Sequence, residues 1–433
     1  MADLMEIGSI YEMTPGSTAQ RPEVSDQEQK SGAVSAGQRI GTGKLPYEGC
    51  TRQPEMEQEQ RTGAVCDGQR TETESGRKHL YLKEVHKYGR GNISYTASGR
   101  EAIALALKSM EKNHPELVRR CLMPAYMCDS VFFPFERAGW ELIFYPVGED
   151  LRADREVLST LIRESRPGLL FVHAYYGVDT WQHLRPYFAD WKKQGVRILE
   201  DVTQSYYLET AGQGADDIVG SLRKWYPVPD GGFAASNDPL EQPWESGQEE
   251  AAAARTEILT EKWRYLHDSQ EWQEGERTAC KQHFLVRNRQ MEESLDHQQG
   301  ARPMSSVSME ILSGIHEEAC KKRRQENYRK LCSFFRNREG WSRRKCRMLL
   351  EEAEQAAPLY LPVMAEDRDG LQRHLAEQQI FAPVLWPVGK ENAPFLTAAE
   401  QEIYGHMLAL PMDQRYGEQE MVYIGRALER YMR

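Results

Sequence analysis

The sequence has few of the features that mark membrane-bound, secreted or nucleic-acid-binding proteins. No stretch of its 433 residues reaches the roughly 20 consecutive apolar residues of a membrane-spanning helix. Residues 1–6 have neither a basic start nor a long apolar run, so we expect no secretory signal. The net charge of -11 disfavours nucleic acid or an anionic membrane as the main partner.

Metal, disulfide and dinucleotide motifs are also missing. The eight cysteines are scattered, and none form the Cys-x-x-Cys pairs of zinc and redox sites. We therefore expect reduced thiols and a cytoplasmic protein. No histidine-carboxylate cluster suggests a metal, and no Gly-x-Gly-x-x-Gly motif joins a strand to a helix.

The first eighty residues differ in composition from the rest. Residues 1–12 include a short, partly apolar segment that we expect to dock on the core. Residues 13–80 are rich in Gln, Glu, Gly, Thr and Ser, and the segment 27–39 returns with changes as 58–70. Two copies are too few for a solenoid, which takes about three. This composition predicts disorder, with a docking arm as the alternative.

Further along, apolar runs and helical patterns alternate. Strands are predicted at 119–123, 141–146, 168–174, 196–200 and 231–236, and helices at 155–164 and 186–193. This alternation is typical of an α/β fold with a doubly wound, mostly parallel sheet. We assign 81–265 to this large domain and 266–433 to a smaller C-terminal α+β domain. A helical stretch is predicted at 249–298, across the boundary between the two domains. Within the C-terminal domain we predict helices at 316–336 and 418–433, and strands at 358–363 and 380–386.

An acid follows one of the apolar runs, and a lysine lies in a short loop downstream of it. Asp201 directly follows the run 196–200, and Lys224 closes the loop Ser221-Leu222-Arg223-Lys224. A strand that delivers an acid, followed by Ser-x-x-Lys, is what a pyridoxal phosphate (PLP) enzyme needs. The lysine forms the aldimine, the acid keeps the pyridine nitrogen protonated, and the serine can hydrogen-bond the phosphate. The alternative for Asp201 is an ordinary turn or helix cap.

A third element lies upstream. The segment from Thr96 to Glu101 contains Ser98 and Gly99 and leads into an apolar periodic run, which predicts a turn that opens a helix. The unpaired N–H groups and dipole of such a helix start favour a phosphate. The alternative is an ordinary N-cap by Ser98.

Together these elements resemble the DegT/DnrJ-type aminotransferases of PLP fold type I. The segments 122–131, 138–147, 170–177 and 323–328 are also similar to that family, and the resemblance covers roughly residue 91 to the C-terminus. It implies catalytic roles for Lys224 and Asp201. The cofactor-binding residues that it implies are Gly99, Arg100, Cys128, His173, Asp201, Gln204, Ser221 and Lys224. Among these, Gln204 would reach the ring 3′-oxygen.

Four positions depart from the family pattern. Cys128 stands where an aromatic residue commonly stacks on the ring, and Ser221 lies three residues before the lysine instead of five. Trp225 replaces an Asn after the lysine, and Asp230 replaces a Glu before Gly-Gly. These departures leave the substrate class open.

The resemblance implies a PLP-dependent aminotransferase that forms homodimers. It would move an amino group from an amino-acid donor to a keto acceptor, such as a nucleotide-linked keto-sugar. The lysine argues against the family's dehydratase branch, which has a histidine there. The alternatives are a PLP-binding regulator, a catalytically degenerate member, or another PLP reaction on an amino acid.

Overall fold

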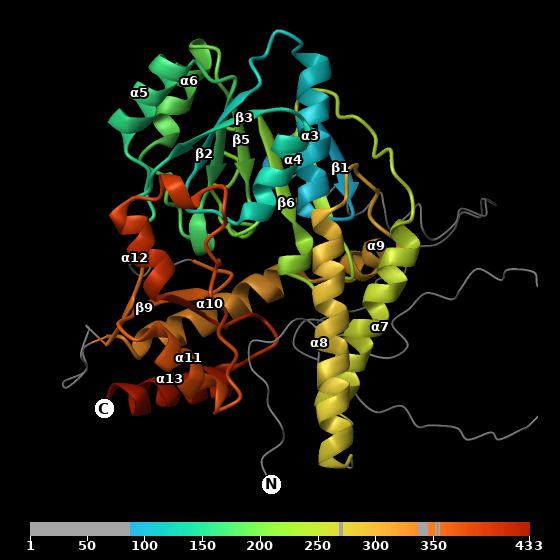
Figure 1. The fold of residues 1–433 in the computed structure, drawn as a ribbon, viewed down its shortest axis with the longest axis vertical. Helices are drawn as coiled ribbons and strands as arrows, with labels where there is room; N and C mark the ends of the chain where they lie inside the picture. The colour runs from blue at the N-terminus through green and yellow to red at the C-terminus, as the bar shows by residue number, and fades with distance from the viewer. Residues whose placement is uncertain (1–86, 268–271, 337–344, 351–352, 354–355) are drawn as a thin grey trace, which may run out of the picture.

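The computed structural model describes residues 87–267, 272–336, 345–350, 353 and 356–433. The predicted docking element at 1–12 and the low-complexity segment at 13–80 lie outside the described residues. Figure 1 shows a large sheet covered by helices, a smaller C-terminal part beside the carboxyl ends of its strands, and a long helical hairpin. Among the described residues, no helix has the length and apolar character needed to cross a membrane.

The large sheet has seven strands in the order β1-β7-β6-β5-β4-β2-β3. Strands β2 to β6 run parallel, and β7 runs antiparallel to both β6 and β1. The strands are β1 Asn92–Thr96, β2 Arg120–Pro124, β3 Glu141–Tyr145, β4 Leu169–His173, β5 Arg197–Asp201, β6 Asp217–Ser221 and β7 Gly232–Ser236. The predicted mostly parallel sheet is confirmed.

Both faces of the sheet are buried, which explains the continuous apolar runs of its central strands. Phe171 and Leu199 face the cluster formed with helices α3 Gly99–Asn113 and α4 Phe132–Arg137. Leu170 and Ile198, one position away, face the cluster of α5 Arg155–Ser165 and α6 Phe188–Lys193. The helices therefore cover the two faces, as a doubly wound fold requires.

The C-terminal part contains a three-stranded antiparallel sheet in the order β10-β9-β8. Its strands are β8 Cys346–Met348, β9 Leu361–Ala365 and β10 Met407–Leu410, and its helices are α10 Glu317–Ser333, α11 Arg368–Ala376, α12 Ala398–His406 and α13 Glu418–Met432. A second apolar core joins this sheet to α10, α11 and α13.

The strand predicted at 380–386 is wrong, because most of this segment is irregular. It runs next to β10, where the Ala409 N–H donates to the Pro383 carbonyl at 3.0 Å. Pro383 has no N–H to return a bond, so a regular ladder cannot form there.

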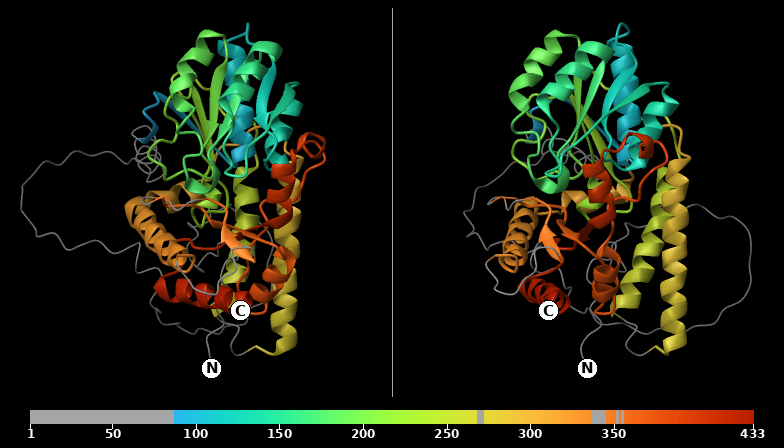
Figure 2. Two further views of the ribbon diagram at one scale, coloured as in Figure 1. Left: turned by 90° about the vertical axis from the view of Figure 1, so that its left-hand side faces the viewer. Right: turned by 60° about the vertical axis from the view of Figure 1, so that its left-hand side comes forward.

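The helices α7 Gln248–His267 and α8 Glu274–Asp296 form the hairpin that extends past the C-terminal part (Figures 1 and 2). The predicted domain boundary at 265/266 falls within α7. A small cluster of Ile258, Tyr265 and Phe284 joins the two helices. After the hairpin, the short helix α9 Ser306–Ser313 returns the chain to the large domain.

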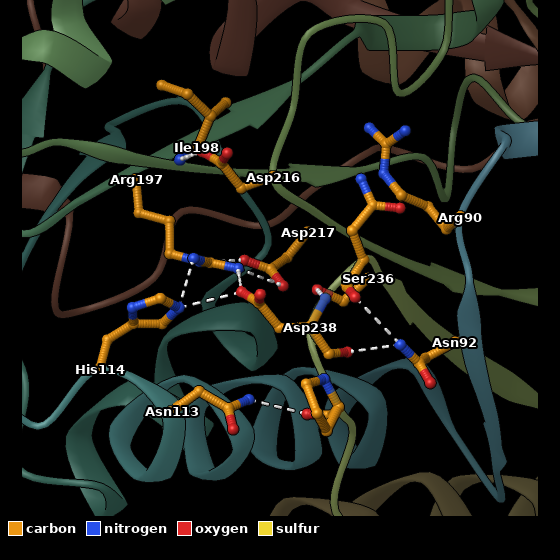
Figure 3. A network of polar contacts seen from close by, with 12 residues as sticks. Arg90, Asn92, Asn113, His114, Arg197, Ile198, Asp216, Asp217, Ser236 and Asp238 are labelled. Atoms are coloured by element: carbon orange, nitrogen blue, oxygen red, sulfur yellow. Dashed lines mark hydrogen bonds and ion pairs between the residues drawn. The ribbon is translucent and has the colours of Figure 1, made fainter.

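A polar network ties together the amino ends of the central strands (Figure 3). Arg197 at the start of β5 pairs with the buried Asp217 at the start of β6, and also with Asp238 after β7. His114, just beyond α3, lies 2.9 Å from Asp238 and 2.7 Å from the Arg197 guanidinium. This network anchors the end of the sheet opposite the strand ends where His173, Asp201 and Ser221 lie.

Candidate functional site

A cavity of about 220 Å³ opens beyond the carboxyl ends of β4, β5 and β6. The residues that the sequence singled out all line it: Gly99, Arg100, Cys128, His173, Asp201, Gln204, Ser221 and Lys224. Trp386 of the C-terminal part also lines it, whereas the nearby Tyr126 and Tyr176 are not among the lining residues. The sheet topology thus collects residues that are far apart in sequence.

The start of α3 is packed closely against the strand ends. Ser98 is the N-cap, and its hydroxyl accepts from the Glu101 N–H and donates to the Glu101 carboxylate at 2.7 Å. A Cβ on Gly99 would lie 3.1 Å from the Ser221 Cβ, so Ser221 sits directly against the first turn. The turn therefore offers backbone N–H groups and a serine hydroxyl to an anion at this end of the cavity.

Asp201 and His173 form the floor of the cavity, and both are buried. One Asp201 oxygen accepts from the Thr203 N–H at 2.8 Å, while the other lies 3.5 Å from His173 Nδ1. Neither His173 nitrogen has a hydrogen-bond partner among the described residues. A ligand in the cavity could therefore engage both side chains.

Gln204 is held in one orientation. Its amide oxygen accepts from the Tyr176 N–H at 2.9 Å, which leaves the NH₂ group as its donor toward the cavity. Because the backbone fixes which end of the amide faces Tyr176, Gln204 is suited to bind an acceptor oxygen on a ligand.

Lys224 ends the short 3₁₀ turn Leu222–Lys224. Its side chain has much accessible surface, yet this surface faces the cavity and protein walls enclose it. This enclosure lowers the pKa of Lys224, with help from the nearby charges of Arg223 and Arg100, while Glu292 opposes the shift. More of the lysine is consequently in the neutral, nucleophilic form at a given pH.

Cys128 contributes a small, uncharged side chain to the cavity wall. Its sulfur is 3.0 Å from the Ser130 hydroxyl oxygen. Burial raises the pKa of the Cys128 thiol, which keeps it protonated near neutral pH.

Two departures from the family pattern have clear structural partners. Trp225 donates its indole N–H to the Thr203 carbonyl at 2.8 Å and packs under the Arg324 guanidinium, 4.6 Å from the ring centre. Gln414 donates to the Trp225 carbonyl at 2.6 Å. Trp225 therefore fixes the lysine turn between the strand ends and the C-terminal part.

Asp230 binds the start of α9. It accepts from the Ser305 N–H at 2.9 Å and the Ser305 hydroxyl at 2.6 Å, and also from the Ser308 hydroxyl. Burial raises the pKa of Asp230 to about 6, although these donors act against the shift. The carboxyl thus secures the segment that follows the hairpin.

Arg223 and Glu292 also line the cavity, although no sequence motif indicates either of them. Arg223 is the neighbour of Lys224, but a basic residue on a loop carries no signal by itself. Glu292 comes from α8, whose polar pattern is that of an ordinary surface helix, so no motif connects it to the site.

The fold of this chain is similar to that of many solved proteins, although its sequence matches none of the known families. No family model matches the sequence, and no curated protein matches it. Many solved structures do match. The sugar aminotransferase CalS13 from Micromonospora echinospora has a TM-score of 0.56 at 14% identity, over 83% of this chain and 92% of that chain. A DegT/DnrJ/EryC1/StrS aminotransferase from Brucella abortus has a TM-score of 0.54 at 15% identity, over 82% and 90%.

NtdA from Bacillus subtilis, whose structure holds the cofactor PMP, has a TM-score of 0.57 at 14% identity, over 82% of this chain and 77% of that chain. The chain has the PLP fold type I, as found in the DegT/DnrJ-type aminotransferases whose motifs its sequence resembles.

Proposed function

We propose that this protein is a PLP-dependent aminotransferase that moves an amino group from an amino-acid donor to a keto acceptor. The observation that carries the proposal is the convergence of Lys224, Asp201 and the first turn of α3 on one cavity. The cavity lies where ligands bind in open α/β sheets, beyond the carboxyl ends of the strands. The likeness to aminotransferase structures supports the same function.

The cavity residues fit PLP in charge and in hydrogen bonding. The α3 start with Ser221 and Arg100 would hold the phosphate, since it offers N–H groups, a hydroxyl and a positive charge. A Cβ on Gly232 would lie 2.3 Å from the Ser98 carbonyl oxygen, so a glycine there permits this tight cradle. The Asp201 carboxylate and the unpartnered His173 ring would face the pyridine.

Bound PLP supplies an electron sink for the bond that breaks at the substrate carbon. Asp201 would hold a proton on the ring nitrogen, and the Thr203 N–H keeps its carboxylate aimed. Gln204 would donate its NH₂ group to the ring oxygen. His173 and Cys128 would line the ring, and Trp386 would help to exclude water from the site.

Lys224 would move the proton. Its lowered pKa favours the neutral amine, so its Nζ would accept a proton from the substrate carbon and deliver it to the C4′ carbon of bound PLP. A keto-sugar acceptor is part of the proposal, because CalS13 is a sugar aminotransferase. A cytoplasmic homodimer remains a prediction from the sequence.

The test is to add PLP to the purified protein, reduce it with borohydride and map the labelled peptide. We expect the label on Lys224, its loss in Lys224→Ala, and its retention in Lys193→Ala, which changes an exposed lysine that pairs with Asp190. L-Glutamate should then convert bound PLP to its amine form in the wild type, followed by absorbance. A label on another lysine, or no saturable PLP binding, would contradict the proposal.

A further inference from the structure

The last turns of α8 bring Glu292 to the cavity and place a second acid, Asp296, against an arginine that lines it. Glu292 pairs with Arg223, and it also lies 2.7 Å from Arg255 of α7. Asp296, one turn later on the same helix, lies 3.1 Å from the Arg100 guanidinium. The two arginines that line the cavity are thus each neutralised by an acid from one helix.

Arg223 differs from Arg100 in its position. Arg100 belongs to the first turn of α3, at the end proposed for the phosphate. Arg223 directly precedes Lys224 in the 3₁₀ turn, so its charge lies on the lysine side, where the substrate must react. The present partner of Arg223 is a carboxylate, and the arginine side chain is largely buried, with 11% exposure. Its guanidinium is therefore already arranged to bind a carboxylate in a partly dehydrated setting.

Positive charges outnumber negative charges around Glu292. Arg223, Arg255 and Lys224 all act on this one carboxylate, and although burial opposes them, they lower the pKa of Glu292. Arg255 is buried, and its Nε has no hydrogen-bond partner in the described part of the chain. If Arg223 turned away, Arg255 would still compensate Glu292, so a second carboxylate could enter without leaving Glu292 unpaired.

The packing of α8 also allows the C-terminal end of this helix to shift. Over the whole of this helix, Phe284 is the one buried side chain, and Glu292 is 34% exposed. A helix with so little buried apolar surface is held weakly, and a small shift of its end would separate Glu292 from Arg223.

We infer that Arg223 binds the carboxylate of the amino-acid substrate, and that Glu292 is the internal counterion that occupies Arg223 between turnovers. The inference rests on the proposed function and extends it to a named recognition residue. The incoming carboxylate takes the place of Glu292 at Arg223, and Glu292 stays paired with Arg255. The ligand class is a carboxylate-bearing amino acid, as opposed to a simple amine.

The test is calorimetric titration of the PLP-loaded protein with glutarate, a dicarboxylate that has no amino group to react. Arg223→Gln should weaken glutarate binding by roughly 10- to 100-fold, the loss of one charge-assisted hydrogen-bonded pair. Arg223→Lys keeps the positive charge but loses the two-pronged guanidinium geometry, so its glutarate affinity should lie between those of the wild type and Arg223→Gln. Glu292→Gln should tighten binding several-fold, because it removes the competing carboxylate. Glu293→Gln, a neighbour on the exposed side of α8, should change nothing.

The same variants separate the inference from the proposed function. The melting temperature of Arg223→Gln should match the wild type and the variant should still bind PLP saturably, which shows that the fold and the cofactor site are intact. If PLP still binds and the glutarate affinity is unchanged in Arg223→Gln, the inference is wrong and the proposed function stands. Equal weakening in Glu292→Gln and Arg223→Gln would show a shared structural role and also overturn the inference. A wild type that binds no PLP would overturn both.

Discussion

Gly232 and Ser98 approach so closely that a Cβ on Gly232 would lie 2.3 Å from the Ser98 carbonyl oxygen and 2.7 Å from the Gly99 nitrogen. This contact presses the first turn of α3 against β7, next to the Lys224 turn. Since Gly232 also pairs with Thr96 of β1, the strand cannot move away without breaking the sheet ladder.

We therefore expect Gly232→Ala to lower the free energy of unfolding by about 1–3 kcal/mol, the usual cost of overpacking. PLP binding should weaken by at least tenfold, because the phosphate end of the cavity is displaced. Urea denaturation and PLP titration measure the two effects. The matched control is Gly405→Ala in α12, where a Cβ meets nothing within 4 Å. That control should be neutral or slightly stabilising, and an equal loss in both variants would contradict the argument.

The sequence was sufficient for the parts of the fold that follow simple periodic rules. The central strands are continuous apolar runs because both of their faces are buried, and the α3 start has a recognisable N-cap and glycine. β6 was missed because Asp217 and Gly220 interrupt its apolar pattern. Asp217 forms an ion pair with Arg197. Gly220 fits because a Cβ at this position would lie 2.6 Å from the Phe233 ring.

Some residues of the candidate site follow from the sequence pattern, and others do not. Asp201 was found because it follows a predicted strand, and Lys224 because its Ser-x-x-Lys loop comes shortly after that acid in the sequence. Glu292 could not be found, since it reaches the cavity through the placement of the hairpin and not through any local pattern. The segment 380–386 is apolar because Ile380 and Ala382 are buried in the C-terminal core and Trp386 packs on His173 at the cavity, and not because it forms a strand.

Arg197→Met tests the network at the far end of the sheet. It would leave the buried Asp217 carboxylate without its guanidinium partner, and breaking a buried pair in this way costs about 3–5 kcal/mol. Because this network lies opposite the cavity, the PLP affinity of the folded protein should stay unchanged. Urea denaturation and PLP titration check both statements. A large loss of PLP affinity at temperatures where the variant is folded would show that the two ends of the sheet are coupled.

Asp201→Asn tests the charge at the cavity floor. Asparagine can still accept the Thr203 N–H bond through its side-chain oxygen, so the melting temperature should change little. It cannot hold a proton on the ring nitrogen by charge, so the rate of the half-reaction with L-glutamate should fall by roughly 100-fold or more. Single-turnover absorbance measures this rate. Near-normal turnover in Asp201→Asn would reduce Asp201 to a turn cap.

Asp230→Asn tests the raised pKa of a buried acid. The pKa of Asp230 is about 6 in the folded protein, against an ordinary value of 3.8, so folding favours its protonated form. The contribution of Asp230 to stability is therefore complete below its ordinary pKa and is lost as the pH rises through about 6. Relative to Asp230→Asn, the wild type should lose up to about 3 kcal/mol of unfolding free energy between about pH 4 and pH 7. Urea denaturation at each pH gives this difference, and Asp190→Asn, at an exposed acid, controls for the removal of one charge. Parallel pH profiles for the wild type and Asp230→Asn would mean that the serine donors fully offset the burial of this carboxylate.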